Sequence, residues 1–433
     1  MSQSLIHINS RKTVTRVITI FVVALSVAWA VFLVRWYIGN TLAEYFDPET
    51  SGEDLARLAV TLAPDDPLTH WRLADFTERE LPVDQIGAAV REYEVAVSLS
   101  PFDYRYWMAL GRALEQASDI QRSENALRRA VELAPSYSYP RWYLGNLLLR
   151  NERYEEAFAE LQLASEADPE LRSQLFNLAW EVFKGDTASL QSVVGQSAAA
   201  RAQFSLYSIG RGRIDDSLQL WSTLSDDERR DNVTTAHAII ESLVNNRKYH
   251  HAASVWNGIT SQPNYQVAIG AILDPGFEDG GSYANASVFG WKLKSHAQAQ
   301  IGIDPNHSHS GSRSLRLIFQ VRSTQSTFNI SQLVPVQPNT QYTFQTFVKT
   351  QKLASAATPM LAIIDAASDT SIANSAPVPA GDNDWQQITL TFRTGANTEA
   401  ITLMLQRSSC GDTQVCPMFG TVWYDDFNLK TGS

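Results

Sequence analysis

Cysteine is nearly absent from this sequence. The 433 residues contain two, Cys410 and Cys416, within one polar stretch and separated by five residues. That gap fits neither the two-residue spacing of a redox motif nor a complete four-ligand zinc set. We favour a disulfide between them over a thiol pair for metal or redox work. A disulfide implies an oxidising compartment outside the cytoplasm.

Runs of basic residues are also absent, and the formal net charge is −11 at pH 7. Nucleic acid is bound by a positive surface that displaces counterions from the phosphates. A chain with this charge and no Lys/Arg-rich segment is therefore not expected to bind nucleic acid.

Common catalytic motifs are missing as well. The sequence has no Gly-rich phosphate loop, no Gly-x-Ser-x-Gly elbow and no His-Glu-x-x-His helix. We therefore expect no enzyme. A glycan-processing enzyme stays open as an alternative, because paired carboxylates can meet only in the fold.

One long apolar run is present, from residue 17 to residue 34, without a single charge. As a helix it would be about 27 Å long, close to the hydrocarbon thickness of a bilayer. Basic residues precede it and acids follow it, which places the N-terminus in the cytoplasm. We predict a cytoplasmic tail (1–16), a single transmembrane helix (17–38) and a linker (39–54), with the bulk of the chain beyond the membrane.

A cleaved signal peptide is the competing interpretation, because Ala28-Trp29-Ala30 has the small-x-small form of a cleavage site. Cleavage there would leave the apolar segment 31–34 as the new terminus. The apolar run is also longer than a usual signal core, so an uncleaved anchor is favoured.

A 34-residue periodicity follows the apolar run. Prolines recur at this spacing, and so do glycine, leucine and alanine positions: Pro101, Pro135 and Pro169; Gly111 and Gly145; Leu127 and Leu161; Ala130 and Ala164. The pattern resembles the tetratricopeptide repeat, in which small residues sit where two helices cross and proline ends the second helix. It predicts an all-α solenoid over 55–260, with three good repeats and later degenerate ones.

Such arrays bind a peptide or a partner's helix in a concave groove. Arg112, Asn146 and Arg150 follow the repeat glycines in register and are the candidate groove residues. A solvated helix face is the equally weighted alternative for these three. The tryptophans of the first helices (Trp71, Trp107 and Trp142) are expected in the core.

Composition changes near residue 261, where helical periodicity gives way to Gly, Ser, Thr and Asn with alternating apolar residues. After a linker (261–272), this pattern predicts an all-β jelly-roll sandwich over 273–433. Six different short motifs follow one another along this segment: Asp274-Pro-Gly-Phe-Glu278, Gly290-Trp291, His309–Leu315, Pro338–Phe344, Asp384–Gln387 and Val422–Phe427. Together they resemble the jelly-roll carbohydrate-binding modules that contain calcium.

That resemblance implies a structural Ca²⁺ held by Glu278 and Asp426, with backbone oxygens near Gly311 and Arg313. Ca²⁺ takes six to eight hard oxygen ligands, so two carboxylates and carbonyls would suit it. The alternative is that Glu278 caps a turn and Asp426 pairs with a neighbouring base.

The resemblance also implies sugar binding, for which aromatic side chains supply flat stacking surfaces. The candidate aromatics are Trp423, Tyr424, Tyr342 and Trp385. Strand alternation places Trp423 and Tyr424 on opposite faces, so one of them is expected to face outward.

The sequence thus predicts a membrane-anchored scaffold of a bacterial inner membrane, with its bulk in the periplasm or outside. The repeats would bind an envelope protein, and the jelly roll would bind glycan or assemble a polysaccharide complex. A lectin-like receptor, with the repeats as a spacer, is the alternative from another class.

Overall fold

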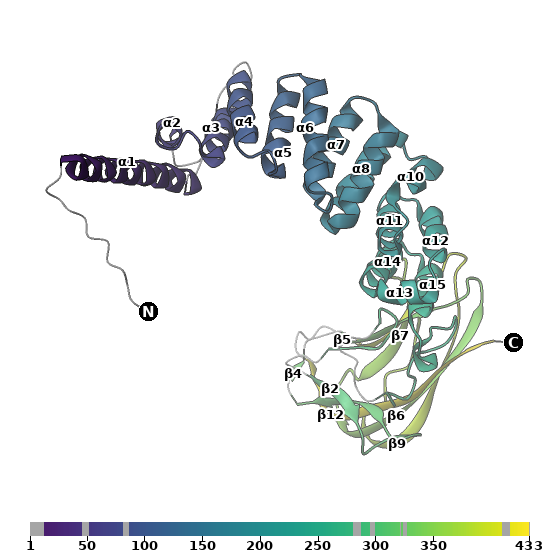
Figure 1. The fold of residues 1–433 in the computed structure, drawn as a ribbon. Helices are drawn as coiled ribbons and strands as arrows, with labels where there is room; N and C mark the ends of the chain where they lie inside the picture. Colours follow the sequence, from purple (N-terminus) through teal and green to yellow (C-terminus); the bar gives the residue numbers. More distant parts are fainter. Residues whose placement is uncertain are drawn as a thin grey trace, which may run out of the picture. The chain divides into compact units, whose positions relative to one another are not determined.

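The computed structural model describes residues 13–45, 52–80, 86–279, 287–294, 299–320, 322–323, 327–408 and 416–432. Helices occupy the N-terminal part of these residues, and antiparallel strands occupy the C-terminal part (Figure 1). The predicted fold class is therefore confirmed: one long apolar helix, an all-α solenoid, and then an all-β sandwich. The chain divides into two compact units, Met1–Gly195 and Gln196–Ser433.

The first unit consists of successive helical hairpins behind one long helix. Its helices are α1 (Thr13–Glu44), α2 (Glu53–Leu62), α3 (Pro67–Glu80), α4 (Ile86–Leu99), α5 (Tyr104–Gln116), α6 (Ile120–Leu133), α7 (Ser138–Arg150), α8 (Tyr154–Ala167), α9 (Arg172–Phe183) and α10 (Thr187–Val194).

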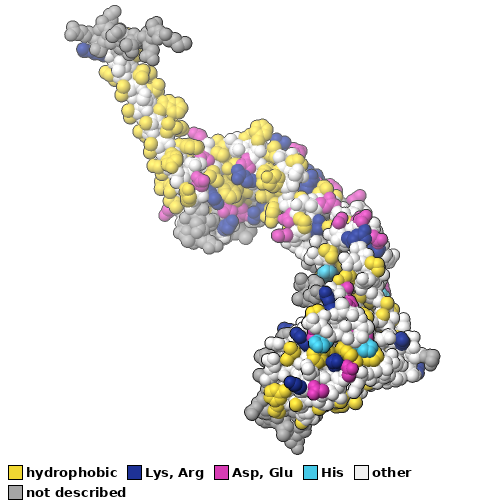
Figure 2. Space-filling model, turned by 90° about the horizontal axis from the view of Figure 1, so that it is seen from below, with side chains coloured by type: hydrophobic (Ala, Val, Ile, Leu, Met, Phe, Trp, Pro, Cys, Tyr) yellow, Lys and Arg dark blue, Asp and Glu magenta, His cyan; other side chains and the backbone are white. Residues whose placement is uncertain are grey.

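Helix α1 has two different parts. Its large apolar side chains up to Ile38 are exposed, and Figure 2 shows hydrophobic side chains along the whole length of this part. It is the one helix of the described residues that is long and apolar enough to cross a membrane. Residues 39–44, predicted as a linker, continue the helix and contact α2 and α3. The small Gly39 and the buried Ala43 allow this close approach.

The repeat glycines lie where the two helices of each hairpin cross, as the periodicity predicts. A Cβ on Gly111 would lie 2.6 Å from Cγ of Leu127, and one on Gly145 would lie 2.6 Å from Cγ of Leu161. Glycine therefore lets the two helices of each hairpin cross closely. The Ser123 hydroxyl adds a hydrogen bond of 2.7 Å to the Gly111 carbonyl.

The second unit begins with five more helices: α11 (Ala198–Gly210), α12 (Ile214–Ser222), α13 (Asp226–Asp231), α14 (Val233–Asn245) and α15 (Tyr249–Ile259). Their core includes Val267 and Phe289 and contacts Leu333 of the sandwich. The Tyr249 hydroxyl donates to the Ala366 carbonyl at 2.8 Å. Because these helices share a core with the sandwich, the compact unit begins well before the predicted domain boundary at residue 273.

The sandwich has two five-stranded sheets, ordered β1-β5-β10-β7-β8 and β2-β3-β12-β6-β9, and a two-stranded ribbon, β11-β4. Its strands are β1 (Lys292–Leu293), β2 (Ala299–Asp304), β3 (Ser314–Phe319), β4 (Arg322–Ser323), β5 (Thr327–Pro335), β6 (Gln341–Ala354), β7 (Pro359–Asp365), β8 (Ser371–Asn374), β9 (Gly381–Arg393), β10 (Ala400–Arg407), β11 (Cys416–Pro417) and β12 (Phe419–Thr431). A single apolar core, rich in aromatic rings, lies between the two large sheets.

Candidate functional site

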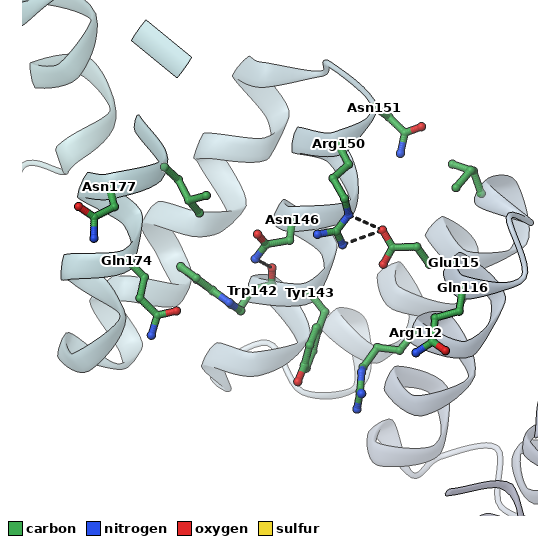
Figure 3. Close-up of a pocket in the computed structure, with 12 residues that line it drawn as sticks. Arg112, Glu115, Gln116, Trp142, Tyr143, Asn146, Arg150, Asn151, Gln174 and Asn177 are labelled. Atoms are coloured by element: carbon green, nitrogen blue, oxygen red, sulfur yellow. Dashed lines mark hydrogen bonds and ion pairs between the residues drawn. The ribbon is translucent and has the colours of Figure 1, made fainter. Parts of the chain in front are cut away.

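A groove of about 890 Å³ runs across the first helices of consecutive repeats in the first unit (Figure 3). Helices α5, α7 and α9 supply most of its lining, and the predicted groove residues Arg112, Asn146 and Arg150 are all part of it. Arg112 and Asn146 occupy the same repeat position, 34 residues apart. The repeat register therefore brings these side chains to one surface.

Both arginines of the groove pair with an acid on the preceding first helix. Arg150 Nε lies 2.6 Å from Glu115 Oε1, and Arg112 Nη2 lies 3.5 Å from Glu78 Oε1. Their side chains remain 57% and 41% exposed, respectively. Each guanidinium is thus held in place while it keeps donors directed at solvent. Both alternatives from the sequence therefore apply to these arginines: they line the groove, and they lie on a solvated helix face.

Aromatic and amide groups complete the groove. Trp142 is only partly buried and lines the groove beside Tyr143, which corrects the expectation that Trp142 belongs to the core. The Arg112 guanidinium lies 5.1 Å from the Tyr143 ring centre. Asn146 donates to the Trp142 carbonyl at 2.8 Å (Figure 3). Trp71 and Trp107 pack against the core as expected.

A second candidate surface is the outer face of the β2-β3-β12-β6-β9 sheet. The His309 ring stacks on Phe347 with centroids 3.6 Å apart and an angle of 12°. Trp385 meets His309 edge-on at 5.7 Å. Figure 2, which views the molecule from this side, shows histidine, charged and hydrophobic side chains gathered on one face of the sandwich.

Polar groups surround these rings. Asp426 Oδ2 lies 2.6 Å from His309 Nδ1, and Lys349 Nζ lies 2.7 Å from Asp384 Oδ1. The hydrogen bond from Lys349 lowers the pKa of Asp384. Gln387 pairs with Phe347 across the strands and is exposed. An aromatic surface bordered by carboxylates and amides is suited to sugar hydroxyls and their apolar ring faces.

Three of the four predicted sugar-binding aromatics are buried. Trp423 is 3% exposed, and Tyr342 and Tyr424 are each 0% exposed. Trp423 donates from Nε1 to Asp304 Oδ2 at 2.8 Å, and the His307 ring covers it with centroids 5.1 Å apart. This corrects the expectation for those three and leaves Trp385 as a partly exposed ring.

His309 and Phe347 could not be identified from the sequence alone, because His309 lies in the loop between β2 and β3 and meets Phe347 only in the fold. The pairing of β12 with β6 shifts between Asp425 and Asn428, and Asp426 has a left-handed φ of 50°. One signal was available, since Phe347 alternates in β6 with the buried Phe344, Thr346 and Val348.

The predicted calcium residues lie in two hydrogen-bonded groups. Glu278 Oε1 accepts the backbone amides of Ser312 and Arg313 at 2.8 and 3.0 Å. Burial opposes ionisation here, but these hydrogen bonds and that of the Ser312 hydroxyl lower the pKa of Glu278. A Cβ on Gly311 would collide with this carboxylate, so glycine is needed there. Asp426 instead contacts His309 and Ser310.

Asp425, rather than Asp426, lies near Glu278, and Gly276 is a neighbour of both carboxylates. A Cβ on Gly276 would lie 3.5 Å from Asp425 Oδ1 and 3.7 Å from Glu278 Cγ. Asp425 is fully buried, and this burial raises the pKa of its carboxyl. A buried carboxylate near a second one suits a cation, although two carboxylates alone supply too few oxygens for Ca²⁺. The described residues contain no cluster of three or more His, Cys, Asp or Glu that could hold a metal.

The predicted disulfide lies partly outside the described residues. Cys416 lies in β11, whereas Cys410 lies outside the described residues.

Two family models match parts of the chain. The carbohydrate binding domain matches residues 270–410, and the tetratricopeptide repeat matches 84–138 and 109–171. The predicted combination of these repeats, a domain similar to carbohydrate-binding modules and one apolar N-terminal helix is thereby confirmed. No curated protein matches this chain in sequence.

Several solved structures match parts of the chain at low identity. A fragment of MamA from Desulfovibrio magneticus RS-1 is 20% identical, covering 31% of this chain and 75% of its own, with a TM-score of 0.27. Pseudomonas aeruginosa PilF is 15% identical, covering 44% and 89%, with a TM-score of 0.32. A chain of the CopN–Scc3 complex is 16% identical, covering 26% and 68%, with a TM-score of 0.24.

Proposed function

We propose that this protein is a membrane-anchored scaffold that binds a protein segment in its repeat groove and a glycan on its sandwich. The alignment of side chains along the groove is the observation that carries the proposal. Helices α5, α7 and α9 present arginine, amide and aromatic groups from equivalent faces of consecutive repeats. A row of this kind matches the regular polar groups of a peptide backbone.

The chemistry of the groove favours an extended segment with acidic or polar side chains. Arg112 and Arg150 are the charged donors, and Asn146, Gln174 and Gln116 add amides. Trp142 and Tyr143 offer apolar area for a side chain of the partner. Because each arginine already contacts an acid, its positive charge is partly offset, and a purely electrostatic partner is less well matched than a mixed one.

Glycan binding belongs to the outer face of the β2-β3-β12-β6-β9 sheet. His309 and Trp385 supply rings, while Gln387, Asp384 and Lys349 supply hydrogen-bonding groups around them. The match to the carbohydrate binding domain includes strands β6 and β9. A Ca²⁺ ion between Glu278 and Asp425 would neutralise the buried carboxylate beneath this surface.

Helix α1 supports the proposed location. The helix can cross a bilayer, and the charges that flank it favour a cytoplasmic N-terminus. We place the repeats and the sandwich on the far side of a bacterial inner membrane, where the protein partner would be an envelope protein.

Glycan binding on the outer face of the β2-β3-β12-β6-β9 sheet, called the sheet face below, is tested with full-length protein in detergent micelles on a printed glycan array. The wild type is expected to bind a subset of glycans, and Trp385→Ala is expected to lose them. Thr421→Ala on the same sheet is the matched control. Equal binding by all three proteins would contradict the assignment.

The groove is tested by affinity purification from membranes of cells that express either of two charge reversals. Arg150→Glu alters the groove, whereas Arg129→Glu alters an exposed ion pair with Glu132 that does not line it. We expect a co-purifying envelope protein to be lost with Arg150→Glu alone. Retention of that protein by both variants would contradict a role for the groove.

A further inference from the structure

A second pocket, of about 480 Å³, lies within the second unit between the last helices and the start of the sandwich. Helix α14 contributes Val233 and His237, and α15 contributes Trp256 and Ile259. Asp274, Asp279 and Trp291 line it from the sandwich side. A smaller cavity of about 200 Å³ shares His237, Trp256 and Ser287 with it, so the two are neighbours.

Aromatic rings in this pocket are held in defined orientations. Trp256 Nε1 donates to the Tyr265 carbonyl at 2.8 Å, and Trp291 Nε1 donates to the Asp274 carbonyl at 3.1 Å. His237 stacks on Trp256 with centroids 5.9 Å apart and an angle of 18°. Trp291 is 2% exposed and forms a buried wall, whereas Trp256 is partly exposed. Because backbone satisfies its indole N–H group, the Trp256 ring offers an apolar face without an unmet donor.

The charged groups of the pocket are of one sign. Asp274 and Asp279 line it, and among the described residues no Lys or Arg does. The negative charge of Asp279 is the main cause that raises the pKa of Tyr265, and burial and a hydrogen bond to Asp279 act in the same direction. Thr260, Ser261 and Gln262 add neutral donors and acceptors.

From this combination we propose that the pocket binds a sugar residue that carries no anionic group. Trp256 and His237 would meet the apolar face of the sugar, and the two aspartates would accept hydrogen bonds from its hydroxyl or amino groups. Carboxylated, sulfated or phosphorylated sugars are excluded because the two aspartates repel them. The site is separate from the sheet face and does not depend on Trp385.

The pocket is also built from both parts of the second unit, so a bound glycan contacts the helices and the sandwich at once. The neighbouring cavity extends the pocket toward Glu241 and Lys292. The site therefore suits a unit within a chain rather than an isolated sugar.

The test uses full-length protein in detergent micelles on a printed array of neutral, amine-bearing and anionic glycans. We compare wild type with Trp256→Ala, with Asp279→Ala and with His237→Ala, the last at an exposed position. The control is His251→Ala, an exposed histidine of α15 that lies outside both cavities. Trp385→Ala reports the sheet face separately.

We expect the pocket variants to weaken binding of one set of uncharged or amine-bearing glycans by about tenfold or more. The His251→Ala and Trp385→Ala proteins should keep that set. The proposal is overturned if no glycan is lost with His237→Ala and Asp279→Ala, or if the glycans lost are anionic. Losses with Trp385→Ala alone would leave the sheet-face proposal standing and reject the pocket.

Discussion

At the scale of single residues, the crossing of helices in each repeat depends on glycine. A Cβ on Gly145 would come within 2.6 Å of Leu161 Cγ and 3.1 Å of the Ala157 carbonyl oxygen. We predict that Gly145→Ala destabilises the first unit by about 1–3 kcal/mol through overpacking. Gly87→Ala, where a Cβ would meet only Arg91 at 3.9 Å, should be neutral or stabilising. Urea unfolding followed by circular dichroism measures both, and equal effects would contradict this account.

Asp304 provides a pH-dependent test of the sandwich. It is fully buried, yet hydrogen bonds from Trp423, the Asn306 amide and His307 outweigh burial and lower its pKa. A lowered folded-state pKa gives stability that is present above the unfolded value, about 3.9, and is lost as pH falls through the folded pKa.

We therefore predict that Asp304→Asn loses about 2 kcal/mol at pH 7, since it removes hydrogen bonds to a charged group. Its melting temperature should also fall less steeply than that of the wild type below about pH 4. Calorimetry across pH 3–7 distinguishes the curves. Parallel curves would show that Asp304 does not carry this dependence.

The calcium proposal makes a further prediction. If Ca²⁺ bridges Glu278 and Asp425, a hundredfold excess over its Kd stabilises the sandwich by about 2.7 kcal/mol. The melting temperature of the wild type should then rise in Ca²⁺ and fall in chelator, and Glu278→Gln should abolish the difference. Asp384→Asn, an exposed acid, is the control. The same melting temperature in both buffers would refute the calcium site.

Some residue roles could be predicted from the sequence, and others could not. The 34-residue spacing places Arg112 and Asn146 on one surface, because equivalent repeat positions share an environment. Strand alternation places Trp423 on the outer face, where it lies, but it could not predict that the His307 ring covers this side chain. Period-two patterns carry no information on bulges or on covering loops.

At the scale of elements, α1 is both the apolar helix and a packing partner of the first hairpin. A Cβ on Gly39 would lie 2.7 Å from Ala63 Cβ and 2.9 Å from the Ala59 carbonyl oxygen. Arg72 Nε donates to the Ala43 carbonyl at 3.0 Å across the same contact. The end of the helix is therefore part of the repeat array.

We predict that Gly39→Leu separates α1 from α2. The hairpin of α2 and α3 should then become sensitive to limited proteolysis, while α5 to α8 stay protected. Gly52→Leu, where a Cβ meets no atom within 4 Å, should leave the digestion pattern unchanged. Mass spectrometry of the fragments gives the readout. An unchanged pattern for Gly39→Leu would mean that this contact does not hold the hairpin.

The sequence could predict which elements form but not where the compact units divide. Periodicity distinguishes helices from strands in each segment. Whether α14 and α15 pack on the sandwich depends on groups far apart in sequence, such as the Tyr249 hydroxyl and the Ala366 backbone carbonyl. The pocket beside Trp256 escaped sequence analysis for this reason, since its lining crosses the predicted boundary at residue 273.

At the scale of the whole molecule, each region has a different proposed partner: the membrane for α1, a protein for the groove, and glycan for the sandwich. The lectin-like alternative differs at one point, because it gives the groove no partner. A protein partner in the groove therefore distinguishes the scaffold from the lectin-like receptor most clearly.

The most direct measurement is site-specific photocrosslinking in living cells, with a photoreactive amino acid at Asn146 in the groove or at Glu132, an exposed residue outside it. The scaffold account predicts a discrete crosslinked protein from position 146 that is absent from position 132 and lost when Arg150→Glu is added. No protein adduct from position 146, or the same adducts from both positions, would contradict the scaffold and leave the repeats as a spacer.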